Sequence, residues 1–163
     1  MDRPLLLVDV DGVISLFGFD PAEPPPGRFE IVDGIPHFLS ADAGRHLQQL
    51  AERFDLAWCS GWEEKANEYL PFALGLPAPL PFVSFGDAPR TPQGHWKLTA
   101  IDSCVRSDRP LAWIDDAHDE CCEAWAATRS GPTLLVGTDA TRGLEPYHVD
   151  RLMSWAGSPR ATG

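Results

Sequence analysis

The stretch that most constrains how this 163-residue chain can fold runs over residues 5–14. It begins with four consecutive apolar residues at 5–8, which is typical of a strand buried on both faces in the middle of a parallel sheet. Two carboxylates two positions apart, Asp9 and Asp11, then follow, with Gly12 directly after them. Acids at the end of a buried strand repel each other and lose hydration, which favours a site for a cation or for phosphate chemistry. The alternative is a simple polar turn.

The composition indicates one globular domain. Apolar residues make up 44% of the chain and charged residues 23%, which excludes a disordered protein. We assign residues 1–157 to a single domain and 158–163 to a flexible tail. No apolar run reaches the 18 residues of a membrane span, and the opening run is too short for a signal sequence. We therefore expect a soluble, cytoplasmic protein with no membrane partner.

The net charge restricts the partners that the chain can bind. With 24 acidic and 13 basic residues, the formal charge is −11. Extensive contact with a nucleic-acid backbone depends on basic residues that displace counterions, so this charge argues against it. A local site for a nucleic-acid end stays open. The acidic balance fits a domain that holds a divalent cation.

The four cysteines do not predict a zinc site. Cys59, Cys104, Cys121 and Cys122 form no C-x-x-C pair, and none has a histidine at zinc-finger spacing. We interpret them as reduced and mostly buried thiols, with the adjacent pair on different faces of a helix.

Apolar periodicity predicts a chain in which strands alternate with helices. Helical patterns begin after Ser40, as an N-cap, at Glu63, around Lys97, after Asp116 and at Pro146. The alternation predicts a central parallel sheet with helices on both faces. We expect about five strands, at residues 5–8, 55–59, 80–85, 111–114 and 133–136.

One insertion, at about residues 15–40, interrupts this alternation. A stiff proline-rich spacer at 20–27 precedes two strand-like runs at 28–32 and 35–39. Asp33-Gly34 between them is a strong hairpin-turn signal, so we predict a small β-hairpin flap. Pro36 would restrict this hairpin to a sheet edge. The insertion is too small to house an independent cap domain.

Polar residues recur where the predicted strands end. Asp9 and Asp11 follow the first strand, Ser60 the second, and the pair Asp115-Asp116 the fourth. Ligands of an open parallel sheet bind outside the carboxyl ends of its strands. Lys97 begins the helix before the fourth strand, so its ammonium can reach the same edge. This repetition predicts one site to which distant segments contribute.

Each of these residues also has a purely structural interpretation. Ser60 and Glu63 match a capping box, which would explain the serine by itself. Lysines on helices are most often solvated, and Lys97 could be one of these. Asp116 could cap a helix beginning at Ala117. A Ca²⁺-binding EF-hand loop starting at Asp9 is excluded, because Val13 and Ile14 stand where that loop needs a ligand and a glycine.

The pattern Asp-x-Asp-Gly-Val at 9–13, then Ser60, Lys97 and the pair at 115–116 resembles the haloacid dehalogenase (HAD) superfamily, whose members are mostly magnesium-dependent phosphohydrolases. A phospho-receiver domain also uses aspartates and a lysine on a parallel sheet, but by family resemblance these residues follow one another along its chain in a different order. The runs 58–67 and 112–116 are similar to small stand-alone HAD domains, whose relatives occur within multidomain RNA-repair proteins. The resemblance implies a HAD-like Rossmannoid three-layer sandwich, with helices on both faces of a parallel sheet, a hairpin flap and no cap domain.

The resemblance also implies a function and a role for each residue. The expected function is Mg²⁺-dependent hydrolysis of phosphomonoesters through an aspartyl-phosphate on Asp9. Asp11 would act as general acid and base. Ser60, Gly61 and Lys97 would bind the substrate phosphate. The implied Mg²⁺ ligands are Asp9, Asp11 through its main-chain carbonyl, Asp115 and Asp116.

The substrate class stays open at this stage. An open site favours a large substrate, or one whose bulk stays outside. A phosphatase specific for nucleic-acid ends and a phosphatase of small metabolites or proteins both fit the sequence. A non-catalytic module that binds a phospholigand and Mg²⁺ on the same scaffold is the remaining alternative.

Overall fold

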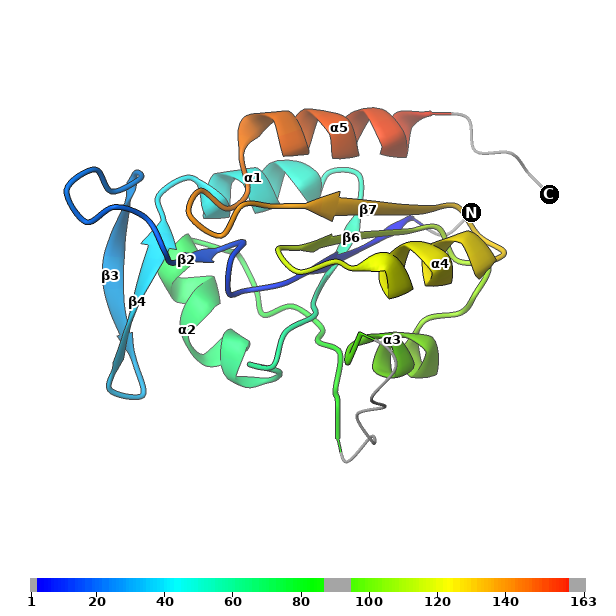
Figure 1. The fold of residues 1–163 in the computed structure, drawn as a ribbon, viewed down its shortest axis with the longest axis horizontal. Coiled ribbons are helices and arrows are strands. Elements are labelled where there is room, and N and C mark those ends of the chain that lie inside the picture. Colours follow the sequence, from blue (N-terminus) through cyan, green and yellow to red (C-terminus); the bar gives the residue numbers. More distant parts are fainter. Residues whose placement is uncertain (1–2, 87–94, 159–163) are drawn as a thin grey trace.

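A computed structural model describes residues 3–86 and 95–158 and shows a mixed α/β fold (Figure 1). Most of the predicted loop at 86–94, and the predicted tail after Ser158, lie outside the described residues. In chain order the elements are β1 (Leu5–Val8), β2 (Ser15–Leu16), β3 (Gly27–Val32), β4 (Ile35–Ser40), α1 (Ala43–Leu50), β5 (Asp55–Trp58), α2 (Lys65–Leu74), α3 (Leu98–Cys104), β6 (Leu111–Asp115), α4 (Glu120–Thr128), β7 (Thr133–Gly137) and α5 (Pro146–Gly157).

The main sheet has four parallel strands in the order β5-β1-β6-β7. The parallel sheet is confirmed, but its expected number of about five strands is wrong. The backbone of the segment predicted as a strand at 80–85 pairs with β5 only through a bridge between Trp58 and Phe82. Its two backbone hydrogen bonds are Trp58 N to Pro81 O and Val83 N to Trp58 O, both 2.8 Å. Pro81 has no N–H to donate, which prevents a longer ladder.

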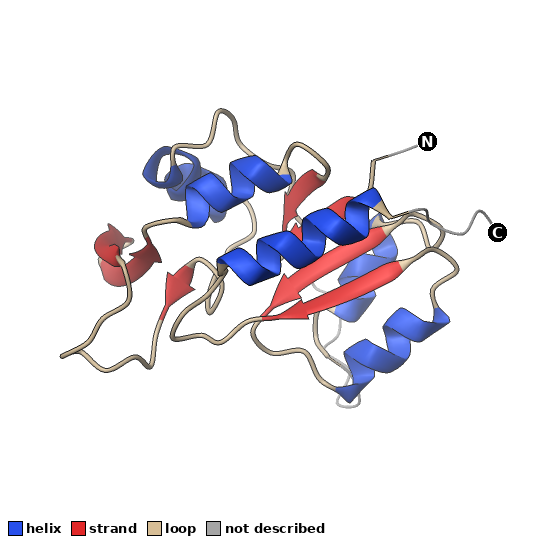
Figure 2. Ribbon diagram, turned by 90° about the horizontal axis from the view of Figure 1, so that it is seen from above, coloured by secondary structure: helices blue, strands red, loops and turns tan. Residues whose placement is uncertain are grey.

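Helices cover both faces of this sheet, as predicted (Figures 1 and 2). Side chains alternate along β1, so that Leu6 and Val8 pack on one face and Leu5 and Leu7 on the other. The first face is covered by α1, α2 and α5, and the second by α3 and α4. The buried run at 5–8 therefore occupies the position that its sequence predicts, between two neighbouring strands and two helix layers.

The predicted hairpin is present as β3 and β4, beside the main sheet (Figure 1). Asp33 and Gly34 have φ angles of 51° and 79°, the left-handed pair that a two-residue hairpin turn requires. The expected edge position is wrong for β4, which lies between β2 and β3. Pro36 is tolerated because β2 pairs only with Phe38 and Leu39.

Some predicted helix starts and burials are also corrected. Ser40 is the last residue of β4, and α1 begins three residues later. The N-cap of α4 is Asp119, whose carboxylate accepts a hydrogen bond from Cys122 N, so Asp116 is not a cap. Cys122 and Cys59 are buried, but Cys104 and Cys121 are exposed because they lie on the outer sides of their helices. Within the described residues, no helix is long and apolar enough to cross a membrane.

A candidate site of acids and lysine at the carboxyl edge of the sheet

The site begins where the two central strands end. In the register of β1 and β6, Val8 lies opposite Ile114, so the next residues, Asp9 and Asp115, are neighbours. The N–H of Asp9 donates to Ile114 O at 3.0 Å, which holds Asp9 against β6. Both side chains are buried, with Asp9 6% and Asp115 1% exposed. The structure thus brings together two acids that are 106 positions apart in the sequence.

Lys97 lies between these two acids. Its Nζ is 3.0 Å from Asp9 Oδ1 and 2.6 Å from Asp115 Oδ2, and it also donates to Cys59 O at 2.8 Å. The residue is 3% exposed and precedes the first turn of α3. The interpretation of Lys97 as a solvated lysine is therefore wrong. One ammonium connects the ends of three strands, β1, β5 and β6.

Burial and charge change the protonation of this cluster. Burial raises the pKa of Asp9 to about 8, and Asp115 adds to this, although the Lys97 ammonium opposes it. Burial disfavours the charged form of Lys97, but the carboxylates of Asp9 and Asp115 outweigh it and raise its pKa. Burial, assisted by Asp115, also raises the pKa of Asp116. Without a further cation, the cluster therefore retains protons that free carboxylic acids would lose.

Gly12 makes room for the third acid. A Cβ at position 12 would lie 2.3 Å from Cγ and Oδ2 of Asp116, and Gly12 has a φ of +83°. Its O accepts a hydrogen bond from Thr138 Oγ1 at 2.8 Å, which fixes this turn. Glycine is thus required twice, by the backbone conformation and by the approach of Asp116.

The acids fit a divalent cation. One ligand atom from each of Asp9, Asp115 and Asp116 lies within 4.8 Å of the others. Three carboxylates face the single ammonium of Lys97, so the ionised cluster carries an excess of negative charge. Mg²⁺ prefers hard oxygen ligands of this kind and usually keeps several waters. Residues Asp9, Asp115 and Asp116 would hold the ion, and the carbonyl of Asp11 is the fourth ligand that the sequence predicted.

Ser60 and Gly61 follow β5 at the same edge of the sheet. Ser60 is 2% exposed, and its Oγ accepts a hydrogen bond from Trp62 N at 3.2 Å. The capping box predicted with Glu63 is not formed, because Glu63 has a φ of 48° and its Oε1 accepts from Phe85 N. Helix α2 begins only at Lys65. Ser60 therefore does not cap helix α2, which was the structural alternative to a role in phosphate binding.

The carboxylate of Asp11 lies apart from the buried cluster and is 52% exposed. Its Oδ2 accepts a hydrogen bond from Trp62 Nε1 at 3.0 Å, and its Oδ1 is 3.9 Å from His37 Nδ1. The rings of His37 and Trp62 contact each other edge-on, and His37 Nδ1 is also 3.1 Å from Ser15 Oγ. Asp11 is thus oriented by one residue of the β4 strand and one of the loop after β5.

Sequence reasoning missed this pair of residues. Neither Trp62 nor His37 lies at a recognisable motif spacing. The position of Trp62, two residues after Ser60, was a usable signal. His37 carried none, because its approach to Asp11 depends on how the hairpin packs.

The fold and this cluster define the chain as an α/β protein with an acidic site at the carboxyl edge of a parallel sheet. No family model matches the chain, and no curated protein matches it in sequence. Among solved structures it is similar to a hypothetical protein from Xanthomonas campestris, with 14% identity and a TM-score of 0.51, over 95% of this chain and 84% of that chain. This similarity shows the fold alone.

Proposed function

We propose that the chain is a Mg²⁺-dependent phosphomonoester hydrolase of the HAD type, with Asp9 as the nucleophile. The observation that carries this proposal is the contact of Lys97 with both Asp9 and Asp115, beside Asp116. Segments far apart in the sequence supply these groups in the order that the resemblance implies. A purely structural ion pair would not need a third carboxylate, nor a glycine turn that accommodates it.

The geometry around Asp9 supports its proposed role in the first step. Its Oδ1 accepts hydrogen bonds from Val10 N at 2.8 Å and from Lys97 Nζ at 3.0 Å, which fixes the plane of the carboxylate. We assign the attack to Oδ2. In this step the bond from Oδ2 to phosphorus forms and the ester P–O bond breaks, so that the difficult hydrolysis is divided into two displacements.

In this proposal, Asp11 transfers the proton. Its exposed carboxyl group, in the protonated form, gives a proton to the departing ester oxygen. The carboxylate that results then takes a proton from the water that attacks the phosphorus of the aspartyl-phosphate. Phosphate and the free Asp9 carboxylate result. The hydrogen bond from Trp62 Nε1 and the nearby His37 hold Asp11 outside the buried cluster, where a leaving group can reach it.

The remaining residues bind the phosphate. Lys97 balances charge on the transferring oxygens, while Ser60 and the backbone at Gly61 donate hydrogen bonds to them. Mg²⁺, when bound by the acids, shields the incoming phosphate dianion from carboxylate charge. In the described part of the chain, only β2 and the β3–β4 hairpin are inserted between β1 and α1, so we expect the bulk of the substrate to remain outside the protein.

The decisive experiment measures phosphate release with and without Mg²⁺. The substrates are an aryl phosphate, sugar phosphates, and 3′- and 5′-phosphorylated oligonucleotides. Comparing these classes also distinguishes a phosphatase of metabolites from a phosphatase of nucleic-acid ends. Wild type should release phosphate from at least one class only with Mg²⁺. Release from none, together with stabilisation by inorganic phosphate, would instead support the non-catalytic binding module.

The nucleophile is tested with Asp9→Asn, which keeps the size of the side chain. We expect turnover to fall by about three orders of magnitude or more, because the attacking oxygen is replaced by an amide. The fold should persist, because Lys97 retains its ion pair with Asp115. Aryl phosphate turnover and the circular-dichroism spectrum measure the two effects. Wild-type turnover by this variant would disprove the assignment.

A further inference from the structure

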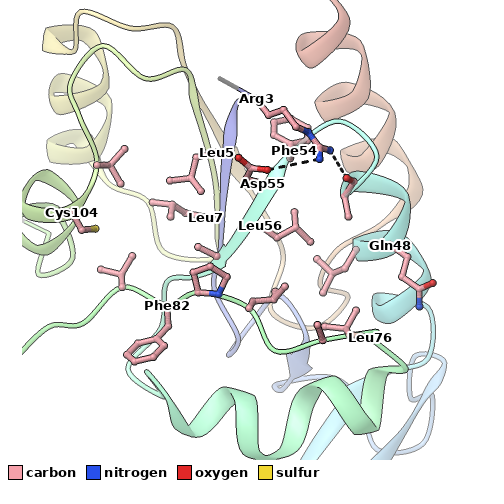
Figure 3. A pocket seen from close by; sticks show the side chains of 18 of the residues that line it. Arg3, Leu5, Leu7, Gln48, Phe54, Asp55, Leu56, Leu76, Phe82 and Cys104 are labelled. Carbon is pink, nitrogen blue, oxygen red and sulfur yellow. Dashed lines mark hydrogen bonds and ion pairs between the residues drawn. The ribbon is translucent and has the colours of Figure 1, made fainter. Parts of the chain in front are cut away.

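A cavity lies along the outer edge of β5 (Figure 3), and no residue of the acidic cluster lines it. It has a volume of about 780 Å³, within the range of small-molecule sites. It lies beside Asp55, Leu56 and Ala57, at the beginning of the strand, whereas Ser60 follows the strand's other end. Most of its lining is apolar and comes from β1, β5, α1 and the segment 76–83.

This cavity exists because the expected fifth strand does not form. The backbone of segment 76–83 pairs with β5 only at Trp58, whose N–H donates to Pro81 O and whose C=O accepts from Val83 N. The N–H groups of Asp55 and Cys59 donate to backbone carbonyls of the β1 segment. Because successive residues of a strand direct their backbone groups to opposite sides, the N–H and C=O of Leu56 point away from β1, toward the outer edge of the sheet. Among the described residues, no backbone group pairs with these two. A donor and an acceptor therefore face an apolar space.

The rim of the cavity carries an excess of positive charge. Three charged residues line it: Arg3, Asp55 and Arg109. Arg109 donates to Asp55 Oδ2 at 2.7 Å, and Arg3 lies 3.8 Å from Asp55 Oδ1, so two guanidinium groups share one carboxylate. The Nε of Arg109 is buried and has no hydrogen-bond partner among the described residues. A positive rim is unusual for a chain with a net charge of −11.

We propose that this cavity binds an apolar monocarboxylic acid, with its hydrocarbon part in the cavity and its carboxylate at the Arg3–Arg109 rim. The apolar lining suits the hydrocarbon. The two guanidinium groups share only one carboxylate, so their remaining positive charge suits the carboxylate of the ligand, because arginine pairs well with planar anions. An added peptide strand does not fit, since strand addition needs several open backbone positions and only Leu56 offers its groups here. This site is independent of the proposed hydrolase activity.

The test compares decanoate with decanol, which has the same chain but no charge. Calorimetric titration of the wild type should give saturable binding of decanoate, at least about tenfold tighter than that of decanol. Asp55→Asn removes the carboxylate that competes for the guanidinium groups, and it should tighten decanoate binding severalfold. Arg109→Gln should weaken it about tenfold. General loosening of the fold would not tighten decanoate binding in Asp55→Asn and weaken it in Arg109→Gln.

A filling variant tests the location. Ala78 is an exposed lining residue, so Ala78→Trp should block the cavity without disturbing the core, and Ala22→Trp on the exposed proline-rich loop is its matched control. We expect only the first to abolish decanoate binding. Equal binding of decanoate and decanol, no binding of either, or unchanged binding in Ala78→Trp would overturn the proposal. Because Asp55 is exposed, Asp55→Asn keeps the test decisive if Arg109→Gln fails to fold.

Discussion

At the scale of single residues, the site separates two carboxylates that the sequence places only two positions apart. Asp9 is buried against Lys97, whereas Asp11 points outward to Trp62 and His37. Environment, more than residue type, thus distinguishes the proposed nucleophile from the proposed acid. The Lys97 ammonium fixes the buried carboxylate of Asp9, whereas the exposed carboxylate of Asp11 keeps access to solvent and to a leaving group.

The orientation of Asp11 predicts a specific effect of Trp62→Phe. Loss of the indole N–H leaves Asp11 Oδ2 without its donor, so the acid should be held less well. General acid catalysis matters most when the leaving oxygen is basic. We expect hydrolysis of an alkyl phosphate to slow about tenfold and hydrolysis of p-nitrophenyl phosphate to change little. Steady-state rates over a series of leaving groups measure this difference.

Trp125→Phe is the matched control for this variant. Trp125 also donates its indole N–H to an aspartate, Asp102 at 2.8 Å, but on the α3–α4 side of the molecule. Its loss should leave the leaving-group dependence unchanged. An equal slowing of both substrates by Trp62→Phe would instead indicate general damage to the site.

At the scale of elements, the turn after β1 determines the shape of the acidic cluster. Strand β1 ends at Val8, and Gly12 then turns with a φ that favours glycine, directly against the Asp116 carboxylate. This turn connects a residue near the amino terminus with the end of β6. The glycine of the Asp-x-Asp-Gly pattern therefore has a measurable packing reason here.

Gly12→Ala should weaken Mg²⁺ binding. The added Cβ would displace Asp116, so we expect about a tenfold loss of Mg²⁺ affinity, together with about 1 kcal/mol of lost stability from the strained φ. Gly34→Ala is the matched control, because Gly34 has a similar φ of +79° and nothing within 4 Å of its added Cβ. It should lose stability and keep its Mg²⁺ affinity. Mg²⁺ titrations of both variants by calorimetry decide this, and equal affinities would contradict the role of Gly12.

The elements also show where local pattern prediction succeeds. Helix α5 begins at Pro146, as predicted, and ends at Gly157, because capping and periodicity depend on neighbouring residues. The segment at 80–85 fails as a strand, because strand formation requires a partner and Pro81 restricts the pairing. Asp33-Gly34 succeeds because turn type is local.

At the scale of the whole molecule, Mg²⁺ should stabilise the fold, because the three carboxylates meet only when distant strands are assembled. At about 100 times its Kd, an ion that binds only the folded state adds roughly 2.7 kcal/mol, which raises Tm by several degrees for a domain of this size. Thermal melts with and without Mg²⁺ measure the shift. An unchanged Tm at saturating Mg²⁺, with no other metal bound, would contradict the site.

The raised pKa of Asp9 predicts a pH dependence of stability. The folded state keeps a proton up to about pH 8 that the unfolded chain releases near its ordinary value of 3.8. The folded state thus binds more protons between these values, and the free energy of unfolding falls as pH rises, by at most about 1.4 kcal/mol per unit.

This dependence is isolated by comparing wild type with Asp9→Asn in the absence of divalent ions. The difference in their free energies of unfolding should fall as pH rises from about 5 to 8, because other titrating groups are common to both proteins. Saturating Mg²⁺ should reduce this decline, since a bound cation favours the ionised carboxylate. A pH-independent difference would show that Asp9 titrates at its ordinary value.

The alternation of strands and helices, the buried first strand and the hairpin turn could be predicted from the sequence, and so could the edge of the sheet at which the acids gather. These follow from periodicity, turn chemistry and strand ends, which depend on residues close together in the chain. Three features could not be predicted: Lys97 contacts both Asp9 and Asp115, Trp62 and His37 orient Asp11, and β5 has a largely unpaired outer edge. Each of these depends on how segments far apart in the sequence pack against one another, and no local pattern carries that information.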